Sequence, residues 1–240
     1  MLQISNDAVR AVPFRKNPII RNAKLFNEAF VDRDFFIRVK NRKLTIVIEG
    51  EEIYIEPITI PKVRNFRIYD LVKNELVYKF DNIDNIIFHY KVIGESDKCI
   101  NVIVYCANIE NYHMLKKESY KGGTFTKINL LQNYLLNYLS KMINEKDYYI
   151  AFKYNRYIYF LLVSKNNLIA NRVMKFDKTL STYTEDFKDF LEEYKEEYSY
   201  INKIYTLEIG LSNIELDNFI VTKLKAVNNR EFLNYIILKG

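Results

Sequence analysis

The chain has 240 residues, of which 49% are hydrophobic and 28% are charged, and its formal net charge is +6. This balance is ordinary for a globular protein, and it does not favour nucleic-acid binding, because Lys and Arg are scattered among Asp and Glu. Two cysteines do not make a disulfide framework, and no apolar run reaches the ~18 residues that span a membrane. We therefore expect a cytoplasmic protein.

Strands dominate the predicted structure at the start of the chain. Two strands are expected within residues 2–14, joined by a tight turn at Ser5, Asn6 and Asp7. Residues 29–41 fit either a short helix or an edge strand. Alternating apolar residues predict further strands at residues 19–26, 44–48 and 53–60.

A helix is predicted at residues 64–80, because apolar residues recur there at the i, i+3, i+4 spacing of one buried face. The apolar members of this face are Ile68, Leu71, Val72 and Leu76. The elements expected next are strands at 86–93 and 100–107, a helix at 109–118, a strand at 124–128 and a helix at 130–142.

The second half is predicted to begin with an antiparallel meander at residues 148–176. Three runs of β-branched and aromatic residues are separated there by two short turns that contain Asn. The middle run, residues 157–163, is apolar on both faces and should be a central strand. A helix capped by Thr184 is expected at 184–200, followed by a strand at 203–209, a helix at 214–227 and a terminal segment at 232–238.

The two halves share one order of elements, since each opens with a meander and continues with a helix and a returning strand. Duplicated lobes of this kind resemble the actin-like, ribonuclease H-like fold. The expected fold class is therefore α/β with mixed (α+β) sheets, built as two lobes with a cleft between them and a small inserted subdomain. The first lobe is expected at residues 1–146, with the insertion at about 62–130, and the second lobe at 147–240.

Three stretches of sequence resemble a known family. The stretch LQISNDAVRAV at residues 2–12 occupies the place where actin-like proteins carry a phosphate-binding hairpin. The stretches EPITIPKV at 56–63 and IFHYKVIG at 87–94, with a helix between them, resemble a segment of the PilM and GspL proteins. These are actin-like cytoplasmic proteins of the inner-membrane platforms of type IV pili and type II secretion. The resemblance extends through nearly the whole chain.

The departures from this family concern nucleotide binding. PilM-type proteins bind ATP through Asp and Gly in the first hairpin, an Asp-x-Gly in the second and a Gly-rich adenosine turn. A polyphosphate needs small residues that let the backbone approach, and Mg²⁺ needs a carboxylate or its waters. We therefore expect no cofactor, no catalytic residue and no enzyme activity. The residues expected at these degenerate phosphate loops are Ser5, Asn6, Lys153 and Gly210.

The resemblance implies a scaffold at the inner face of the cell membrane. It implies that a groove takes the cytoplasmic tail of a PilN-type membrane protein and that a PilB-type assembly ATPase is a second partner; a homodimer is left open. The residues expected to form the walls of this groove are Leu44, Ile46, Ile48, Ile68, Leu71 and Val72.

Other readings of the sequence remain open. An actin-like or kinase-related enzyme that binds ATP is the first alternative, and a nucleic-acid-binding module that uses the Tyr- and Lys-rich surface is the second. No metal site is expected, because the spacing of His89, Cys99, Cys106 and His113 matches no ligand pattern. Glu49, Glu51 and Glu52 surround a turn and are expected to solvate it.

Overall fold

The computed structural model describes residues 2–4, 8–11, 26–30, 43–110, 124–177, 180–208, 216, 218–227 and 229–239. By its internal contacts the chain divides into two compact units. Unit 1 consists of Met1–Glu51, Asn111–Glu145 and Lys225–Gly240, and unit 2 consists of Glu52–Glu110 and Lys146–Leu224. Within the described residues, every helix is too short or too polar to cross a lipid bilayer.

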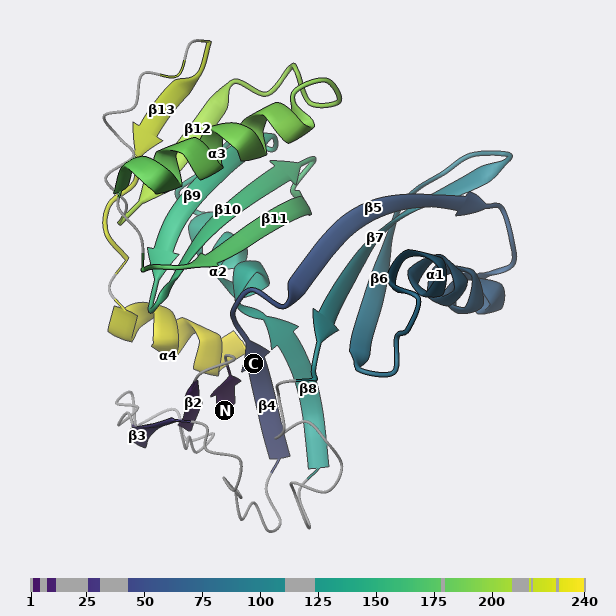
Figure 1. Cartoon of the computed structure of the whole chain (residues 1–240), viewed down its shortest axis with the longest axis horizontal. Helices are drawn as coiled ribbons and strands as arrows, with labels where there is room; N and C mark the ends of the chain where they lie inside the picture. The colour runs from purple at the N-terminus through teal and green to yellow at the C-terminus, as the bar shows by residue number, and fades with distance from the viewer. Residues whose placement is uncertain are drawn as a thin grey trace. The chain divides into compact units, whose positions relative to one another are not determined.

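Unit 1 is built on a five-stranded sheet of order β3-β2-β1-β4-β8 (Figure 1). The first three strands form an antiparallel meander, and β1, β4 and β8 run parallel to one another. The strands are β1 (Leu2–Ile4), β2 (Ala8–Ala11), β3 (Phe26–Phe30), β4 (Lys43–Ile48) and β8 (Thr124–Leu130).

Two helices complete the described part of unit 1, namely α2 (Leu131–Leu139) and α4 (Asn229–Lys239). Tyr138 of α2 meets Phe232 and Tyr235 of α4 edge to face, with ring centroids 5.5 and 5.3 Å apart. Among the side chains of α4 that the structure describes, Phe232, Leu233 and Ile236 are buried. The terminal segment is therefore a helix that packs against α2.

A three-stranded antiparallel sheet of order β5-β7-β6 forms the first part of unit 2. Its elements are β5 (Ile53–Pro61), α1 (Asn65–Phe80), β6 (Ile86–Glu95) and β7 (Cys99–Asn108). Helix α1 covers one face of this sheet, and the cluster beneath it contains Ile68, Val72 and Leu76 together with Val102 and Val104 of β7. The predicted helix is confirmed, and Ile68, Val72 and Leu76 of its predicted face are buried, whereas Leu71 is half-buried.

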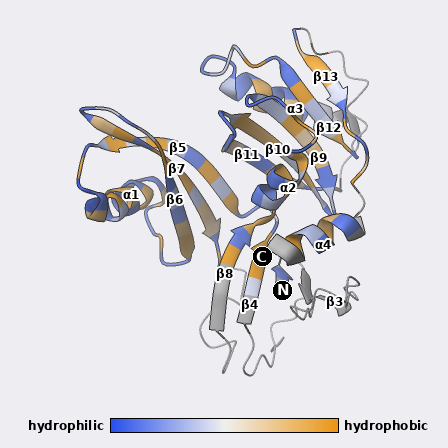
Figure 2. Ribbon diagram, turned by 180° about the vertical axis from the view of Figure 1, so that it is seen from behind, coloured by the Kyte–Doolittle hydropathy of each residue, from blue (hydrophilic) through white to orange (hydrophobic). Residues whose placement is uncertain are grey.

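The second part of unit 2 is a five-stranded sheet of order β11-β10-β9-β12-β13. Every residue of β10 is buried, which confirms the predicted central strand. Helix α3 (Leu180–Tyr194) packs against it, with the ring of Phe187 4.8 Å from that of Phe160, and its ribbon in Figure 2 carries both hydrophilic and hydrophobic colour. The strands are β9 (Tyr148–Tyr154), β10 (Tyr157–Ser164), β11 (Asn167–Lys175), β12 (Lys203–Leu207) and β13 (Ile220–Lys223).

The two five-stranded sheets have the same plan. In each, three consecutive strands form an antiparallel meander, and its first strand is followed outward by two parallel strands. The predicted duplication is therefore confirmed in the strand order. The inserted three-stranded sheet begins at Ile53, before the expected position 62. Its internal contacts place it in unit 2, together with the second five-stranded sheet. Strand β8, which was expected within the insertion, belongs to the sheet of unit 1.

Two predicted elements of the second half are wrong. The region predicted as a helix at 214–227 contains β13, which pairs in parallel with β12; its β-branched residues Ile220, Val221 and Thr222 suit a strand. Thr184 does not cap α3, because the helix already begins at Leu180. The hydroxyl of Tyr183 donates to the backbone oxygen of Lys175 and accepts from the backbone N–H of Asp177, which fixes the helix start near the end of β11.

Several predictions fall on residues outside the described ranges. These are the turn Ser5–Asp7, residues 19–25 and 31–41, most of the helix at 109–118 with His113, and Gly210.

Candidate functional site

The carboxyl ends of the parallel strands in unit 1 form one edge of the sheet. Ile4, Ile48 and Leu130 are paired across β1, β4 and β8, so the three strands end in register. In open α/β sheets, ligands bind beyond this edge of the strands. This edge is therefore the first candidate site.

Two polar side chains are buried near this edge. Gln3 of β1 is 1% exposed and Glu49, which directly follows β4, is 4% exposed. The Gln3 amide Nε2 donates a hydrogen bond of 2.9 Å to Oε2 of Glu49. The prediction that Glu49 solvates a turn is wrong, since its carboxylate is inside the protein and bonded to the neighbouring strand.

Gln132 lies in the first turn of α2, directly after β8, and is 0% exposed. Neither its amide nitrogen nor its amide oxygen has a hydrogen-bond partner among the described residues. Burying an amide without a partner costs free energy, so such a group is a candidate for contact with a ligand. Sequence reasoning missed Gln132, because a Gln within an apolar helix pattern gives no periodic signal.

Lys153 is the expected phosphate-loop residue that the structure describes. It lies in β9 and is half-buried, with its Nζ 3.5 Å from the ring centroid of Phe176. This cation–π contact engages the ammonium within unit 2. Ser5, Asn6 and Gly210 lie outside the described residues, so the degeneracy of these loops stays a prediction.

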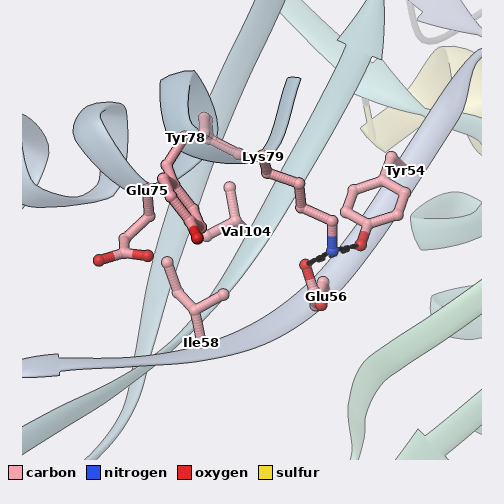
Figure 3. A pocket seen from close by; sticks show the side chains of 8 residues that line it. Tyr54, Glu56, Ile58, Glu75, Tyr78, Lys79 and Val104 are labelled. Carbon is pink, nitrogen blue, oxygen red and sulfur yellow. Dashed lines mark hydrogen bonds and ion pairs between the residues drawn. The ribbon is translucent and has the colours of Figure 1, made fainter. Parts of the chain in front are cut away.

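The second candidate site is a groove in unit 2 between α1 and β5, of about 330 Å³ (Figure 3). Ile58, Leu76 and Val104 give it an apolar lining. Glu75 and Tyr78 line it from the helix, and Tyr78 is 88% exposed. Such a groove can hold apolar side chains of an extended chain and place a basic one beside Glu75.

Three polar side chains gather at the end of this groove where Lys79 meets β5. Lys79 Nζ lies 2.5 Å from Oε2 of Glu56, and the Tyr54 hydroxyl donates a bond of 2.7 Å to the same oxygen (Figure 3). Lys79 Nζ also donates to the Tyr54 hydroxyl and lies over the Tyr54 ring, 4.6 Å from its centroid. The cluster fixes the end of α1 against β5.

The surroundings of this cluster keep the Tyr54 phenol and the Cys106 thiol protonated. Burial raises the pKa of Tyr54, and its hydrogen bond to the Glu56 carboxylate raises it further. Burial, assisted by the charge of Glu56, raises the pKa of the Cys106 thiol to about 12. Because the thiolate and not the thiol is the nucleophile, Cys106 is unreactive at neutral pH. The groove is therefore suited to binding a partner rather than to thiol chemistry.

The residues expected to form the partner groove lie mostly in the interior. Ile46 and Ile48 of β4 are buried in unit 1, and Ile68 and Val72 of α1 are buried in unit 2. Leu71 is half-buried, and Leu44 lies in β4, where the structure describes its backbone alone. Buried side chains leave almost no area for a partner, so α1 can form a wall only through residues such as Glu75, Tyr78 and Lys79.

Glu75 and Tyr78 were missed because the i, i+3, i+4 pattern selects the face of the helix that packs on its own sheet, a face that was predicted to include Lys79. The sequence did contain one signal of the groove, because the aromatic Tyr78 lies off the apolar face of the helix and next to charged residues. Across the residues that the structure describes, no three His, Cys, Asp or Glu side chains gather as a metal site.

No protein-family model and no curated protein matches this sequence. Among solved structures, the chain is similar to one in a PilM-PilN type IV pilus biogenesis complex, with 14% identity, a TM-score of 0.57 and coverage of 96% of this chain and 90% of the other. It is also similar to the cytoplasmic domain of EpsL, an inner-membrane component of the type II secretion system of Vibrio cholerae, with 9% identity, a TM-score of 0.54 and coverage of 100% and 94%.

A third similar structure is a Bacteroides thetaiotaomicron protein of unknown function with an actin-like ATPase fold, with 14% identity, a TM-score of 0.50 and coverage of 99% and 86%. The resemblance to PilM and GspL that the sequence motifs indicate is confirmed at the level of the fold. At these identities the likeness establishes architecture and not chemistry. The strand order of the two sheets and these neighbours agree that the chain has the actin-like ATPase fold.

Proposed function

We propose that this chain is a non-catalytic component of an inner-membrane assembly platform of the type IV pilus or type II secretion kind. The observation that carries the proposal is the fold likeness over nearly the full length of two proteins whose names place them in such platforms. In this role the chain lies at the cytoplasmic face of the membrane, binds the tail of a PilN-type membrane protein and connects it to a PilB-type assembly ATPase.

The groove between α1 and β5 is our candidate for the tail-binding site. Cytoplasmic segments next to membrane spans carry an excess of Lys and Arg. Glu75 forms no ion pair or hydrogen bond with any described residue, so its carboxylate is available to a basic side chain. The apolar lining from Ile58, Leu76 and Val104 suits apolar side chains of an extended tail.

A peptide titration tests this site. The probe is a synthetic peptide of the cytoplasmic residues of the PilN-type protein from the same organism, followed by fluorescence anisotropy, with a scrambled peptide for comparison. Glu75→Lys should weaken binding at least about tenfold, which corresponds to about 1.4 kcal/mol. Asp70→Lys makes the same charge change on an exposed residue of α1 that does not line the groove, and it should leave the affinity within about threefold.

Equal losses of peptide affinity in both variants would show that the groove is not the binding site, although the PilN-type protein would still be a partner. No binding by the unmodified protein would reject the partner.

A nucleotide-binding, actin-like or kinase-related protein is the second candidate function. The unpartnered buried amide of Gln132 beside the carboxyl edge of the sheet favours it. Against it, the Glu49 carboxylate already accepts a bond from Gln3, and Lys153 is engaged by Phe176. Thermal unfolding with ATP and Mg²⁺ separates the two. A nucleotide at 100 times its dissociation constant would stabilise the fold by about 2.7 kcal/mol, and we expect no such gain.

A further inference from the structure

Strand β6 is apolar and yet contains no buried side chain. Six of its ten residues are Ile, Phe, Tyr or Val, and all of them are half-buried or exposed, with Val92 at 43% and Ile93 at 40% exposure. Strand β7 beside it is mostly buried. Ile86, Phe88 and Tyr90 pack in part against the cluster beneath α1, whereas Val92 and Ile93 are exposed. Apolar side chains left exposed on a strand mark a surface that another chain can cover.

The outer edge of β6 carries backbone groups that no described strand uses. β6 pairs with β7 and with no other strand among the described residues. The backbone N–H of Ile109 donates to the oxygen of Asn85, and Ile86 lies opposite Asn108. The backbone N–H and C=O groups of the odd-numbered residues of β6 therefore point towards β7. The N–H and C=O groups of Phe88, Tyr90 and Val92 therefore point outward.

The opposite edge of the same sheet is protected. The N–H of Asn108 donates to the oxygen of Glu52, so the backbone N–H and C=O groups of the odd-numbered residues of β5 point away from β7. Two of these are Pro57 and Pro61, which have no N–H to offer, and the oxygen of Ile53 accepts a bond from the Asn171 amide. Prolines and side-chain contacts on an edge prevent pairing with other strands. β6 has no proline, and no strand in the described part of the chain pairs with its outer edge.

We propose that two copies of this chain form an antiparallel dimer through their β6 edges, with the two His89 residues opposite each other. The regular part of β6 runs from Ile86 to Val92, because the pairing with β7 shifts register between Val92 and Gly94. His89 is the centre of this stretch, so a two-fold axis at His89 lets every residue from Ile86 to Val92 pair with the second copy. Phe88 then lies opposite Tyr90 of the second copy, and Ile86 opposite Val92.

The surroundings of β6 fit a second copy. Tyr69 of α1 stacks on Phe88 with ring centroids 5.0 Å apart, and Phe66, three residues earlier on the helix, is 69% exposed. Joining the two sheets brings these aromatic flanks together from both sides. With ~150–250 Å² per large aromatic side chain, the pair buries roughly 1,000 Å², the lower limit for a specific interface. An interface of this size is typical of a weak, transient association.

Cysteine cross-linking tests the register directly. In a Cys99→Ser background, His89→Cys should form an intermolecular disulfide on mild oxidation, because residues opposite each other in a non-hydrogen-bonded pair have Cβ atoms about 4.5–5.5 Å apart. Lys91→Cys alone should not cross-link, since Lys91 lies opposite Ile87 of the second copy. A mixture of the Lys91→Cys and Ile87→Cys proteins should cross-link.

Sedimentation equilibrium tests the association without oxidation. The mass should rise from 28.8 kDa towards twice that value with concentration. Val92→Lys should weaken the dimer at least about tenfold, because it places a charge on the pairing edge. Thr59→Lys, on the protected edge of β5, is the matched control and should leave it unchanged. A monomer at all concentrations, or cross-linking by Lys91→Cys alone equal to that by His89→Cys, would overturn the proposal.

Discussion

The Gln132 side chain holds both polar atoms of its amide away from water and from any partner among the described residues. We predict that Gln132→Leu raises the free energy of unfolding by about 1–3 kcal/mol, because it removes a buried polar group that lacks hydrogen bonds and keeps a similar volume. Urea unfolding measures this change. Asn133→Leu, one residue further along α2 and partly exposed, should change the stability by less than about 0.5 kcal/mol. A loss of stability in Gln132→Leu would show that the amide is satisfied in solution.

At the scale of residues, the sequence identified which side chains form the core better than it identified the site. Ile68, Val72 and Leu76 follow a helical period that burial enforces. The Gln3–Glu49 bond joins residues 46 positions apart, and no local pattern reports such a pair. Glu75 and Tyr78 obey no period, since a residue that faces a groove is not selected for packing.

The β10–β11 hairpin contains a strained turn. Lys165 and Asn166 both have positive φ, at 49° and 61°, between the paired residues Ser164 and Asn167. A two-residue turn of this shape favours Asn-Gly, because a Lys with positive φ costs about 1 kcal/mol or more. We predict that Lys165→Asn combined with Asn166→Gly stabilises the protein by about 1 kcal/mol in chemical unfolding. Lys165→Ala keeps the strained backbone and should give no gain; an equal gain from it would contradict the explanation.

At the scale of elements, the same turn helps to explain why the β9–β11 meander was easier to predict than the rest of the second half. Short Asn-bearing turns and a strand that is apolar on both faces specify β9, β10 and β11 almost uniquely. β13 was predicted as a helix, because a four-residue strand offers too few residues to reveal a period of two. The grouping of the β5–β7 sheet with the second sheet depends on contacts such as Asn171 to Ile53, 118 residues apart, which local patterns do not contain.

For the whole molecule, buried phenols and a buried thiol predict instability at high pH. Burial raises the pKa of Tyr149 to about 12, with the charge of Tyr200 as a smaller cause, and burial raises the pKa values of Tyr54, Tyr194 and Tyr198 as well. In the unfolded chain the Cys106 thiol loses its proton above about pH 9 and the phenols lose theirs above about pH 10, while the folded protein keeps these protons. Each group then removes about 1.4 kcal/mol of stability per pH unit.

The midpoint of thermal unfolding should therefore fall steeply from pH 10 to 11.5, where the phenols and the thiol both contribute. It should fall only slightly from pH 8 to 9.5, where the thiol alone contributes. Tyrosinate absorbance of the folded protein should lag behind that of the unfolded chain over the same range. Tyr149→Phe removes one of the titrating groups, so its stability should fall less steeply with pH. Identical slopes would mean that Tyr149 is accessible to solvent when folded.

The two units should also respond differently to removal of the last helix. Deleting residues 225–240 takes at least four buried side chains out of unit 1, at a cost of about 5 kcal/mol or more. The buried side chains described there are Val227, Phe232, Leu233 and Ile236. Hydrogen exchange should show faster exchange in β4 and α2 than in the intact protein, with β10 still protected. Equal loss of protection in β10 would indicate that the chain unfolds as one cooperative body.

The chain passes from one unit to the other four times, at Glu51, Glu110, Glu145 and Leu224. This has a consequence for biosynthesis. Unit 2 has all of its residues once Leu224 has left the ribosome, whereas unit 1, although begun first, has to wait for α4 before it can close. A nascent chain therefore carries a finished half and an unfinished one at the same moment, and the exposed partner face of α2 is where a chaperone would be needed.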